Sequence, residues 1–589
     1  MDQLQRELDE ILALKQQSKR NERLIEFTQK LRSLSFLDPA CGCGNFLIIT
    51  YRELRRLELK VLHAQHGGSM ALGLEIQPGI PLNNFYGIEI DEWPARIAEV
   101  AMWLTQHQMN VEFAKTFGEE PDLLPLKEHA NIHHKNALEL DWAQVVEPQH
   151  LNYIIGNPPF VGYVYRKPEQ TASQEKVFDG VPSFKKLDFV ASWFYKAAKF
   201  SVNTDIQAGL VSTNSICMGE QTGVLWQPML DMGIKINFAH RTFAWDNDAK
   251  GKAAVHCIIV GFAHFDRAEK WLYDYPNIKG EPNKIQVENV NPYLVDAPSL
   301  VIDNRTKPIC NVSIMVKGSQ PTDNGHLLLT AEEKNDLLTK QPGLVQWIKP
   351  ILGAQEFLNN GERYCLWLAN ASTKELRDLM QIPEIKQRID GVKQMRLAST
   401  KAATRKKAET PWLFDEIRQP KGTYILVPSV SSERRPYVPM GFFTKDTIST
   451  NLNLVIPEAG LYEFGILTSQ MHMDWMRVVA GRLKSDYRYS AKLVYNNFPW
   501  PQTHDSQKSQ IEKLAQAVLD ARQVEFDKDP TTSRADLYDP DLMPPTLRKA
   551  HQALDKAVDK LYSAKGFKTP LERVKHLFEL YQQLTTKET

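Results

Sequence analysis

The organisation of the chain is set by residues Tyr153–Phe160, which read YIIGNPPF. The apolar run at 153–155, rich in β-branched residues, favours a buried strand. Pro158 and Pro159 then fix φ and prevent a helix from starting directly after that strand. We therefore expect a stiff loop with a polar residue, Asn157, at its head. The alternative interpretation is a proline-capped turn that only closes the strand.

The loop carries the groups that a planar amine requires. The side-chain carbonyl of Asn157 and a carbonyl of the Pro-Pro unit can each accept a hydrogen bond from one exocyclic NH2 group. Phe160 offers a flat face for the ring that bears this amine. The stretch therefore predicts a site for an aromatic amine.

Three other predicted strands end in residues that suit a ligand. A strand at 34–38 is followed by a glycine turn, Cys41–Gly44, and a helix, so that backbone can approach a ligand closely. The turn completes neither a dinucleotide fingerprint nor a P-loop. Glu89 ends the second strand, where an acid can bind both hydroxyls of a ribose. Asn136 follows the third strand and can contact an adenine ring.

Alternating strands and helices predict an α/β domain with a doubly wound, mostly parallel sheet. Ligands bind such sheets outside the carboxyl ends of the strands. The glycine turn, Glu89, Asn136 and Asn157 all fall at those ends. We therefore expect them to form one site.

Composition narrows the class of protein. The chain has 589 residues, which predicts two to four domains on a prior of about 150 residues each. Its 71 Lys and Arg balance 71 Asp and Glu, so contact with a polyanion must come from local patches. Six scattered cysteines predict neither a disulfide frame nor a zinc site, and no metal is expected. Since no long apolar run or signal peptide is evident, we expect a cytoplasmic protein without a membrane partner.

Three motifs resemble motifs I, II and IV of the S-adenosylmethionine-dependent amino-methyltransferases that act on N6 of adenine in DNA. They are DPACGCGNF at 38–46, GIEID at 87–91 and NPPF at 157–160. Further segments resemble the MmeI-like family of type IIL restriction-modification enzymes. These segments lie at 241–255, 430–435, 487–490, 497–501 and 536–562. Together the matches span nearly the whole chain.

The resemblance implies a site-specific DNA adenine-N6 methyltransferase with S-adenosyl-L-methionine as cofactor. The residues that it implies for the cofactor are Asp38, Ala40 and Gly42 at the methionine moiety, Glu89 at the ribose, and Ile90 and Asn136 at the adenine. The residues that it implies for catalysis are Asn157, Pro158, Pro159 and Phe160. Because the target base must be flipped out of the duplex, Phe160 would stack on one of its faces. Phe243 or Trp245 would cover the other face, with core filling as an equal alternative for either residue.

The resemblance also divides the chain into four parts. These are an N-terminal helical segment at 1–33, a seven-stranded methyltransferase domain at 34–265, an α+β target-recognition domain at 266–502 and a helical C-terminal domain at 503–589. Beside a DNA-modifying domain, the basic run from 386 to 407, which includes Arg396, predicts phosphate contacts. The residues expected to bind duplex DNA are Arg405, Lys406, Lys407, Glu433, Arg434, Arg435, Arg482, Lys484 and Arg488.

Members of this family usually carry an N-terminal nuclease and a helical connector ahead of motif I, and this sequence begins just before that motif. We therefore expect no DNA cleavage by the chain, and a separate chain carrying the nuclease and helical regions is an expected partner. Two alternatives stay open. The first is a DNA-recognition subunit or truncated remnant without independent activity, and the second is an amino-methyltransferase that acts on RNA or protein.

Overall fold

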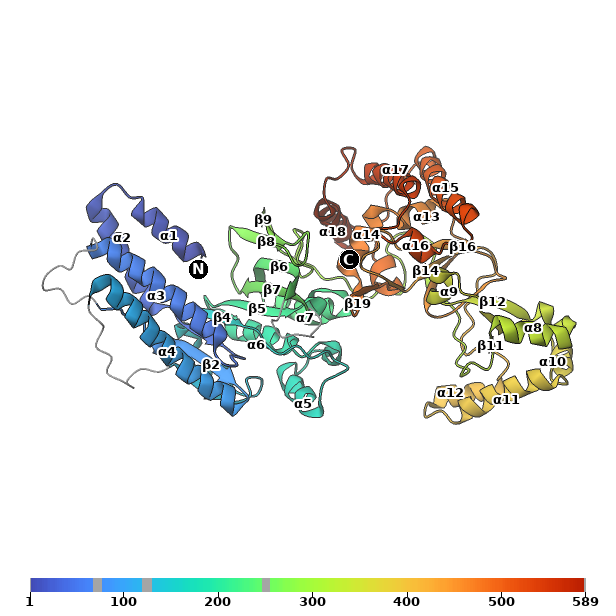
Figure 1. The fold of residues 1–589 in the computed structure, drawn as a ribbon, viewed down its shortest axis with the longest axis horizontal. Coiled ribbons are helices and arrows are strands. Elements are labelled where there is room, and N and C mark those ends of the chain that lie inside the picture. The colour runs from blue at the N-terminus through green and yellow to red at the C-terminus, as the bar shows by residue number, and fades with distance from the viewer. Residues whose placement is uncertain (1, 67–76, 119–129, 246–254, 587–589) are drawn as a thin grey trace. The chain divides into compact units, whose positions relative to one another are not determined.

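A computed structural model describes residues 2–66, 77–118, 130–245 and 255–586 (Figure 1). The chain divides into two compact units, which we describe separately. The first comprises Met1–Cys217 and Gln221–Val301, and the second comprises Met218–Glu220 and Ile302–Thr589. None of the helices among the described residues combines the length and the apolar character that a membrane crossing requires.

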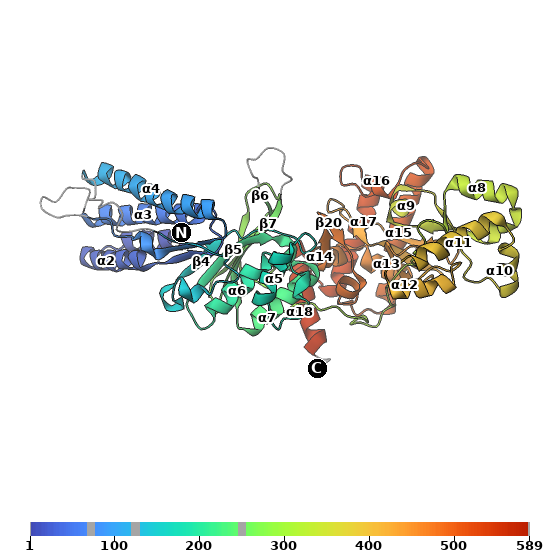
Figure 2. The same ribbon diagram turned by 90° about the horizontal axis from the view of Figure 1, so that it is seen from below.

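A mixed, mostly parallel sheet forms the centre of the first unit (Figure 2). Its described strands are β1 (Phe36–Asp38), β2 (Phe85–Glu89), β3 (Asn131–His134), β4 (Tyr153–Gly156), β5 (Gln207–Thr213), β6 (Lys235–Trp245), β7 (Val255–Ala263), β8 (Lys270–Asp274) and β9 (Asn283–Val287). They lie in the order β3-β2-β1-β4-β5-β7-β6-β8-β9. Strands β3 to β5 in this order are parallel, and β7 runs antiparallel to both β5 and β6. The expected doubly wound α/β fold is confirmed.

The sheet is wider than the seven strands expected, since it has nine strands within the described residues. Both extra strands follow residue 265, where the methyltransferase domain was expected to end. Strand β8 pairs with the outer edge of β6, and β9 pairs with β8. The buried side chain of Leu272 joins the core of the first unit, so β8 covers an edge of β6 that would otherwise be open.

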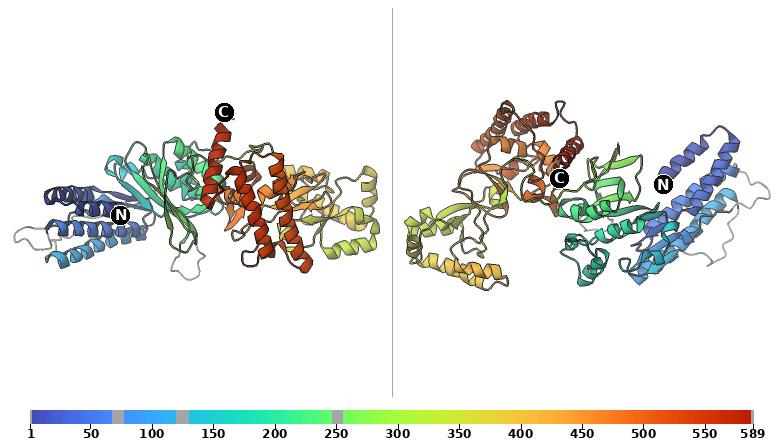
Figure 3. Two further views of the ribbon diagram at one scale, coloured as in Figure 1. Left: turned by 90° about the horizontal axis from the view of Figure 1, so that it is seen from above. Right: turned by 180° about the vertical axis from the view of Figure 1, so that it is seen from behind.

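Helices lie on both faces of this sheet (Figure 3). They are α1 (Asp2–Leu12), α2 (Gln17–Ser33), α3 (Asn45–His66), α4 (Glu92–Phe117), α5 (Pro168–Val177), α6 (Ala191–Ser201) and α7 (Gly219–Asp231). Alternate residues of the central strands enter different apolar clusters: Leu37 and Ile154 pack with residues of α6 and α7, whereas Phe36 and Phe85 pack with residues of α1 to α4. The Phe36 ring stacks on Phe85 at 5.3 Å and on Tyr153 at 5.2 Å. Burial on both faces explains why these strands carry apolar residues on both faces ahead of their polar ends.

The second unit contains three small sheets with strand orders β10-β18-β14-β16, β11-β13-β12-β17 and β15-β20-β19. Their strands are β10 (Val316–Lys317), β11 (Leu328–Leu329), β12 (Ile348–Leu352), β13 (Tyr364–Leu366), β14 (Tyr424–Pro428), β15 (Val430–Ser431), β16 (Gly441–Phe443), β17 (Ile448–Ser449), β18 (Asn453–Pro457), β19 (Gly481–Leu483) and β20 (Asp486–Arg488). The unit is therefore α+β up to about residue 500.

The helices of the second unit are numbered α8 to α18. They are α8 (Ala331–Lys340), α9 (Ala354–Asn359), α10 (Thr373–Leu379), α11 (Pro383–Leu397), α12 (Ala402–Lys406), α13 (Leu461–Leu467), α14 (Gln470–Val479), α15 (Asp505–Lys528), α16 (Arg534–Leu537), α17 (Pro545–Tyr562) and α18 (Pro570–Thr586). Helices α15 to α18 form the helical region that the sequence predicts after residue 503.

One arginine of the basic run, Arg396, is buried and holds neighbouring segments together. Arg396 is 0% exposed, and its guanidinium donates hydrogen bonds to five backbone carbonyls at 2.8–3.2 Å. The acceptors are Pro321, Thr322, Lys407, Thr410 and Leu413. The prediction of a phosphate contact is therefore wrong for Arg396, because its charge is used to join α11 to two loops.

Replacing Arg396 by methionine should destabilise the second unit, because it leaves buried carbonyls without donors. We expect Arg396→Met to lower the free energy of unfolding by about 3–5 kcal/mol. Urea denaturation followed by circular dichroism measures this loss. Lys393→Met, at an exposed position of the same helix, is the control and should change the value by less than about 0.5 kcal/mol. Equal losses in the two variants would contradict the internal role of Arg396.

Candidate functional site

The site begins where the strand order reverses. Strand β1 lies between β2 and β4, so the connections from β1 and from β4 leave the sheet in opposite directions. Asp38 ends β1 and Gly156 ends β4. A Cβ atom added to Gly156 would lie 2.5 Å from Asp38 Oδ1. Glycine at 156 therefore leaves room for the Asp38 carboxylate. Because β1 and β4 are paired neighbours, the glycine turn and the loop at 157–160 start side by side.

Asp38 has a buried carboxyl group, and only one of its two oxygens has a hydrogen-bond partner in the described structure. It is 1% exposed, and its Oδ1 accepts a hydrogen bond of 3.0 Å from the Ala40 amide. Its Oδ2 is buried and has no hydrogen-bond partner among the described residues. Burial raises the pKa of Asp38 to about 7, the Ala40 hydrogen bond opposes this shift, and the charge of Glu89 adds to it. A ligand group that donates to Oδ2 would complete this site.

Glu89 is joined to the glycine turn. Its Oε2 accepts a hydrogen bond of 2.9 Å from the amide of Gly42, and its Oε1 accepts one of 2.9 Å from Asp91. Gly42 has a φ of +52°, and no atom lies within 4 Å of the place where its Cβ would be. The structure thus brings together two of the predicted cofactor residues and leaves space in front of their turn.

Two further predicted cofactor residues lie at the ends of β2 and β3. Ile90 is 60% exposed although it is apolar. Asn136 Oδ1 accepts a hydrogen bond of 3.0 Å from the Leu138 amide, and its Nδ2 donates to Ser173 Oγ at 3.1 Å. Ser173 in turn donates to Glu139 at 3.0 Å. Sequence reasoning missed Ser173, because it lies on α5 with no motif around it.

The loop at 157–160 alternates between exposed and buried residues. Asn157 and Pro159 are exposed, Pro158 is buried, and Phe160 is half-buried against the core. The Asn157 side chain makes no hydrogen bond within the part of the chain that the structure describes, so its carbonyl is open to a donor. Exposed Tyr165, which the motifs did not single out, lies on the continuation of this loop.

Contacts from distant segments fasten the site. The Trp193 indole donates a hydrogen bond of 3.0 Å to the carbonyl of Pro39. Asp188 Oδ1 accepts one of 3.1 Å from the amide of Tyr163, and the Phe189 amide donates to the carbonyl of Val161 at 2.9 Å. The segment from Asp188 to Trp193, which runs into the first turn of α6, therefore holds both the start of the glycine turn and the loop after Phe160.

The two aromatic residues expected on the second face of a target base lie on β6. Phe243 pairs with Cys257, which pairs with Thr213 at the end of β5, so Phe243 is at the same edge of the sheet as Asn157. Strands β5 and β7 separate it from β4. Its ring stacks on Tyr275 at 5.2 Å and lies 5.9 Å from the ring of Trp245. Stacking on a base stays a prediction, and residues 246–254 of the matched segment lie outside the described residues.

In the second unit, four of the expected DNA-binding residues gather on or beside the sheet β15-β20-β19. They are Glu433, Arg482, Lys484 and Arg488. The Arg482 guanidinium donates to Glu433 at 3.2 Å and lies 3.8 Å from the centre of the Tyr487 ring. Lys484 and Arg488 are exposed. Residues about 50 positions apart in the chain thus form one surface. The sequence alone predicts them only as separate basic patches.

The other expected DNA-binding residues have internal partners or lie elsewhere. Arg434 is exposed and pairs with Asp541. Burial lowers the pKa of the half-buried Arg435, while the charges of Asp486 and Asp539 oppose this shift. The side chains of Arg405, Lys406 and Lys407 are exposed at the end of α12. Arg405 donates to the carbonyls of Ser399 and Thr400, and Lys407 donates to that of Asp415, each at 2.8 Å.

Comparisons with known proteins match three consecutive parts of the chain to family models. The models describe the MmeI DNA-methyltransferase domain at residues 14–274, the MmeI target recognition domain at 296–502 and the MmeI C-terminal domain at 503–588. A solved structure of the type IIL restriction-modification enzyme MmeI in complex with DNA is similar over 99% of this chain and 77% of that chain. Its sequence identity is 46%, and its TM-score is 0.82.

Two curated proteins are also similar. DNA methyltransferase A of Bacillus subtilis (strain 168) is 39% identical over 570 residues, which are 96% of this chain. The present chain spans 63% of the length of that relative. A putative type II restriction enzyme and methyltransferase of Methanocaldococcus jannaschii is 35% identical over 98 residues, or 16% of this chain and 8% of that protein.

The buried Asp38 carboxyl should make stability depend on pH. Because burial raises its pKa from 3.8 to about 7, its contribution to stability is complete below pH 3.8 and is lost as the pH rises through about 7. Asp38→Asn cannot ionise. We expect its stability relative to the unmodified chain to increase by about 2–3 kcal/mol between pH 5 and pH 8. Urea denaturation of both proteins at each pH measures this difference, and a constant difference would contradict the raised pKa.

Proposed function

Because this chain belongs to the MmeI family, we propose that it is a site-specific DNA methyltransferase of a restriction-modification or phage-defence system. In this proposal it transfers a methyl group from S-adenosyl-L-methionine to N6 of an adenine flipped out of duplex DNA. The observation that carries the proposal is the side-by-side start of the glycine turn and the Asn157 loop at the β1–β4 switch point.

The residues around the turn suit S-adenosylmethionine. When bound, this cofactor supplies an electrophilic methyl group on a sulfonium. Asp38 Oδ2, which lacks a partner in the described structure, suits a donor of the methionine moiety. Glu89 uses one lone pair on each oxygen for Gly42 and Asp91, and a carboxylate keeps further lone pairs for the hydroxyls of a ribose. Exposed Ile90 offers apolar surface to the adenine ring.

The loop can bring the target amine into the reactive shape. The lone pair of an aromatic amine is delocalised into its ring. Acceptance of its two hydrogens by Asn157 Oδ1 and the Pro158 carbonyl favours the pyramidal form, in which the lone pair points out of the ring plane. No strong base is needed before transfer, since the nitrogen loses its proton after it has become cationic. The contribution of the chain is alignment, which can lower a barrier by about 7 kcal/mol or more.

The second unit supports duplex DNA as the substrate over RNA or protein. Its match to a target recognition domain indicates DNA binding. Arg482, Arg488 and Glu433 are suited to base edges, since arginine pairs with guanine and glutamate with the cytosine amine. Flipping the adenine costs a few kcal/mol, which stacking on Phe160 partly offsets. A separate nuclease-bearing chain and a cytoplasmic location stay predictions.

Cofactor binding should depend on Glu89. We expect Glu89→Ala to weaken S-adenosylmethionine binding by more than about 100-fold, because two charge-assisted hydrogen bonds are lost. Isothermal calorimetry measures the affinity. Glu99→Ala is the control, since Glu99 pairs with Arg96 on α4 and should leave binding unchanged. Equal affinity of Glu89→Ala and the unmodified chain would show that the cofactor does not bind at this turn.

Methyl transfer should depend on Asn157. Asn157→Ala removes one of two acceptors of the target amine, so we expect transfer to fall by about 100-fold or more while cofactor affinity stays the same. Labelled methyl incorporated into plasmid DNA gives the rate, and mass spectrometry of nucleosides identifies N6-methyladenine. Failure of the unmodified chain to form N6-methyladenine would overturn the proposed function.

A further inference from the structure

We propose that Arg477 of α14 is a positioning residue for DNA sequence recognition, and that the C-terminal helices α17 and α18 act on specificity through it. The segment positioned is Ser432–Pro436, here called the recognition loop, which carries Glu433, Arg434 and Arg435. This inference rests on the proposed function, in which Glu433 of this loop contacts a base edge.

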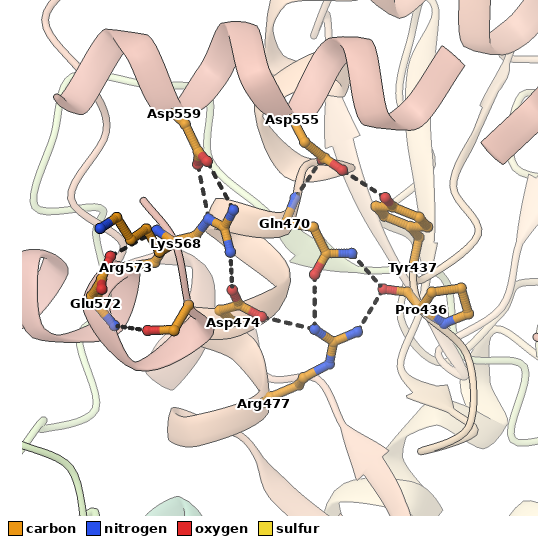
Figure 4. A network of polar contacts seen from close by, with 11 residues as sticks. Pro436, Tyr437, Gln470, Asp474, Arg477, Asp555, Asp559, Lys568, Glu572 and Arg573 are labelled. Carbon is orange, nitrogen blue, oxygen red and sulfur yellow. Dashed lines mark hydrogen bonds and ion pairs between the residues drawn. The ribbon is translucent and has the colours of Figure 1, made fainter. Parts of the chain in front are cut away.

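Two side chains of α14 hold the end of the recognition loop (Figure 4). The carbonyl of Pro436 accepts a hydrogen bond of 2.6 Å from Arg477 Nη2 and one of 3.3 Å from Gln470 Nε2. Arg477 Nη1 also donates to Gln470 Oε1 at 3.0 Å. The three groups thus form a closed ring of hydrogen bonds around one backbone carbonyl.

The next residue is anchored in α17. Tyr437 is 5% exposed, and its hydroxyl donates to Asp555 Oδ2 at 2.6 Å (Figure 4). Its ring stacks on His551, with the centres 3.9 Å apart. Asp555 Oδ1 accepts a hydrogen bond of 2.8 Å from the backbone amide of Gln470. A residue of the C-terminal region thereby joins α14 to the chain directly after the recognition loop.

Arg477 is itself oriented by a buried ion network. Its Nη1 donates to Asp474 Oδ1 at 2.8 Å, and Asp474, whose side chain is 1% exposed, accepts at Oδ2 from Arg573 at 3.2 Å. Arg573 on α18 makes a two-pronged pair with Asp559 on α17 at 2.8 and 2.9 Å. Charge-assisted and bidentate contacts of this kind fix geometry strongly when they are buried. The path from α18 to the Pro436 carbonyl is therefore continuous.

The other end of the recognition loop is fixed independently. Strand β15 pairs with β20 through Val430 with Arg488 and Ser431 with Tyr487. The Arg477 contacts thus supply the second of two clamps. Hydrogen bonds to base edges need donor–acceptor distances of about 2.7–3.2 Å and nearly linear angles, so a small shift of Pro436 would weaken the base contacts of the loop.

The competing explanation is that Arg477 only stabilises the fold. The ion network allows the two explanations to be distinguished. The Arg477 side chain is 26% exposed, and Asp474 keeps its pair with Arg573 when Arg477 is replaced. Arg477→Gln should therefore fold. It should lose the guanidinium contacts to Pro436, Gln470 and Asp474 while the helices stay paired.

The test selects bound duplexes from a random-sequence DNA pool with the full chain and sequences them. We expect the unmodified chain to enrich one motif. Arg477→Gln should lose about tenfold of its discrimination at one or more motif positions, which is the usual cost of one base contact. The relaxed positions should coincide with those relaxed by Glu433→Ala or Arg435→Ala. Arg477→Lys, with a single ammonium, should restore part of the preference.

Arg32→Gln is the matched control. Arg32 in the first unit also joins a carboxylate, Glu58 at 3.0 Å, to a backbone carbonyl, that of Gln77 at 3.1 Å. It should leave the selected motif unchanged. If Arg477→Gln does not fold, Gln470→Met is the substitute. It removes the second donor to Pro436 but keeps the hydrogen bond from the backbone amide of residue 470 to Asp555. It should relax the same motif positions.

Each outcome decides the inference. An unchanged motif in folded Arg477→Gln, or in Gln470→Met as its substitute, would overturn it, and so would a lack of any preference in the unmodified chain. Relaxed positions that differ from those of the loop variants would also overturn it. Selection by binding does not require methyl transfer. A chain that selects a motif but forms no N6-methyladenine would therefore refute the proposed function separately.

Discussion

The site depends on one close approach, that of the Gly156 backbone to the Asp38 carboxylate. The order of strands makes β1 and β4 neighbours, and the absence of a side chain at 156 leaves room for the Asp38 carboxylate between their ends. Because the following segments turn in opposite directions, one carries the residues suited to a cofactor and the other carries Asn157. The same approach buries Asp38, and the energetic consequence is a carboxyl group whose pKa rises to about 7.

The glycine turn and the loop after Phe160 are held in place by hydrogen bonds from residues far away in the sequence. Trp193 holds the carbonyl of Pro39, and Asp188 holds the amide of Tyr163. Each hydrogen bond contributes only about 1 kcal/mol to stability. Their larger effect is on position, since alignment of an amine with an electrophilic carbon is lost when groups shift by about 1 Å. The strands beneath are buried on both faces, which gives these loops a stiff support.

The second unit uses charges in two ways that look alike in the sequence. Arg396 donates to five backbone carbonyls, and Arg477 donates to one backbone carbonyl and two side chains, so both order loops from within. Arg488 and Lys484 instead keep their charges in water, where they can meet a polyanion. Ion pairs at the surface contribute little free energy. The buried set around Asp474 is different, because each charge there must stay paired to avoid a large desolvation cost.

The sequence by itself determined the α/β class, the glycine turn, the strand ends that carry Glu89 and Asn136, and the stiff loop at 157–160. These features are local: apolar runs, glycines and prolines restrict the backbone through their immediate neighbours. Only the tertiary structure decided that β8 and β9 extend the sheet, that Ser173 contacts Asn136, and that Arg396 is buried in a basic run. Partners tens to hundreds of residues apart leave no periodic pattern in the chain, and a charge reads the same in a sequence whether it faces water or a ring of carbonyls.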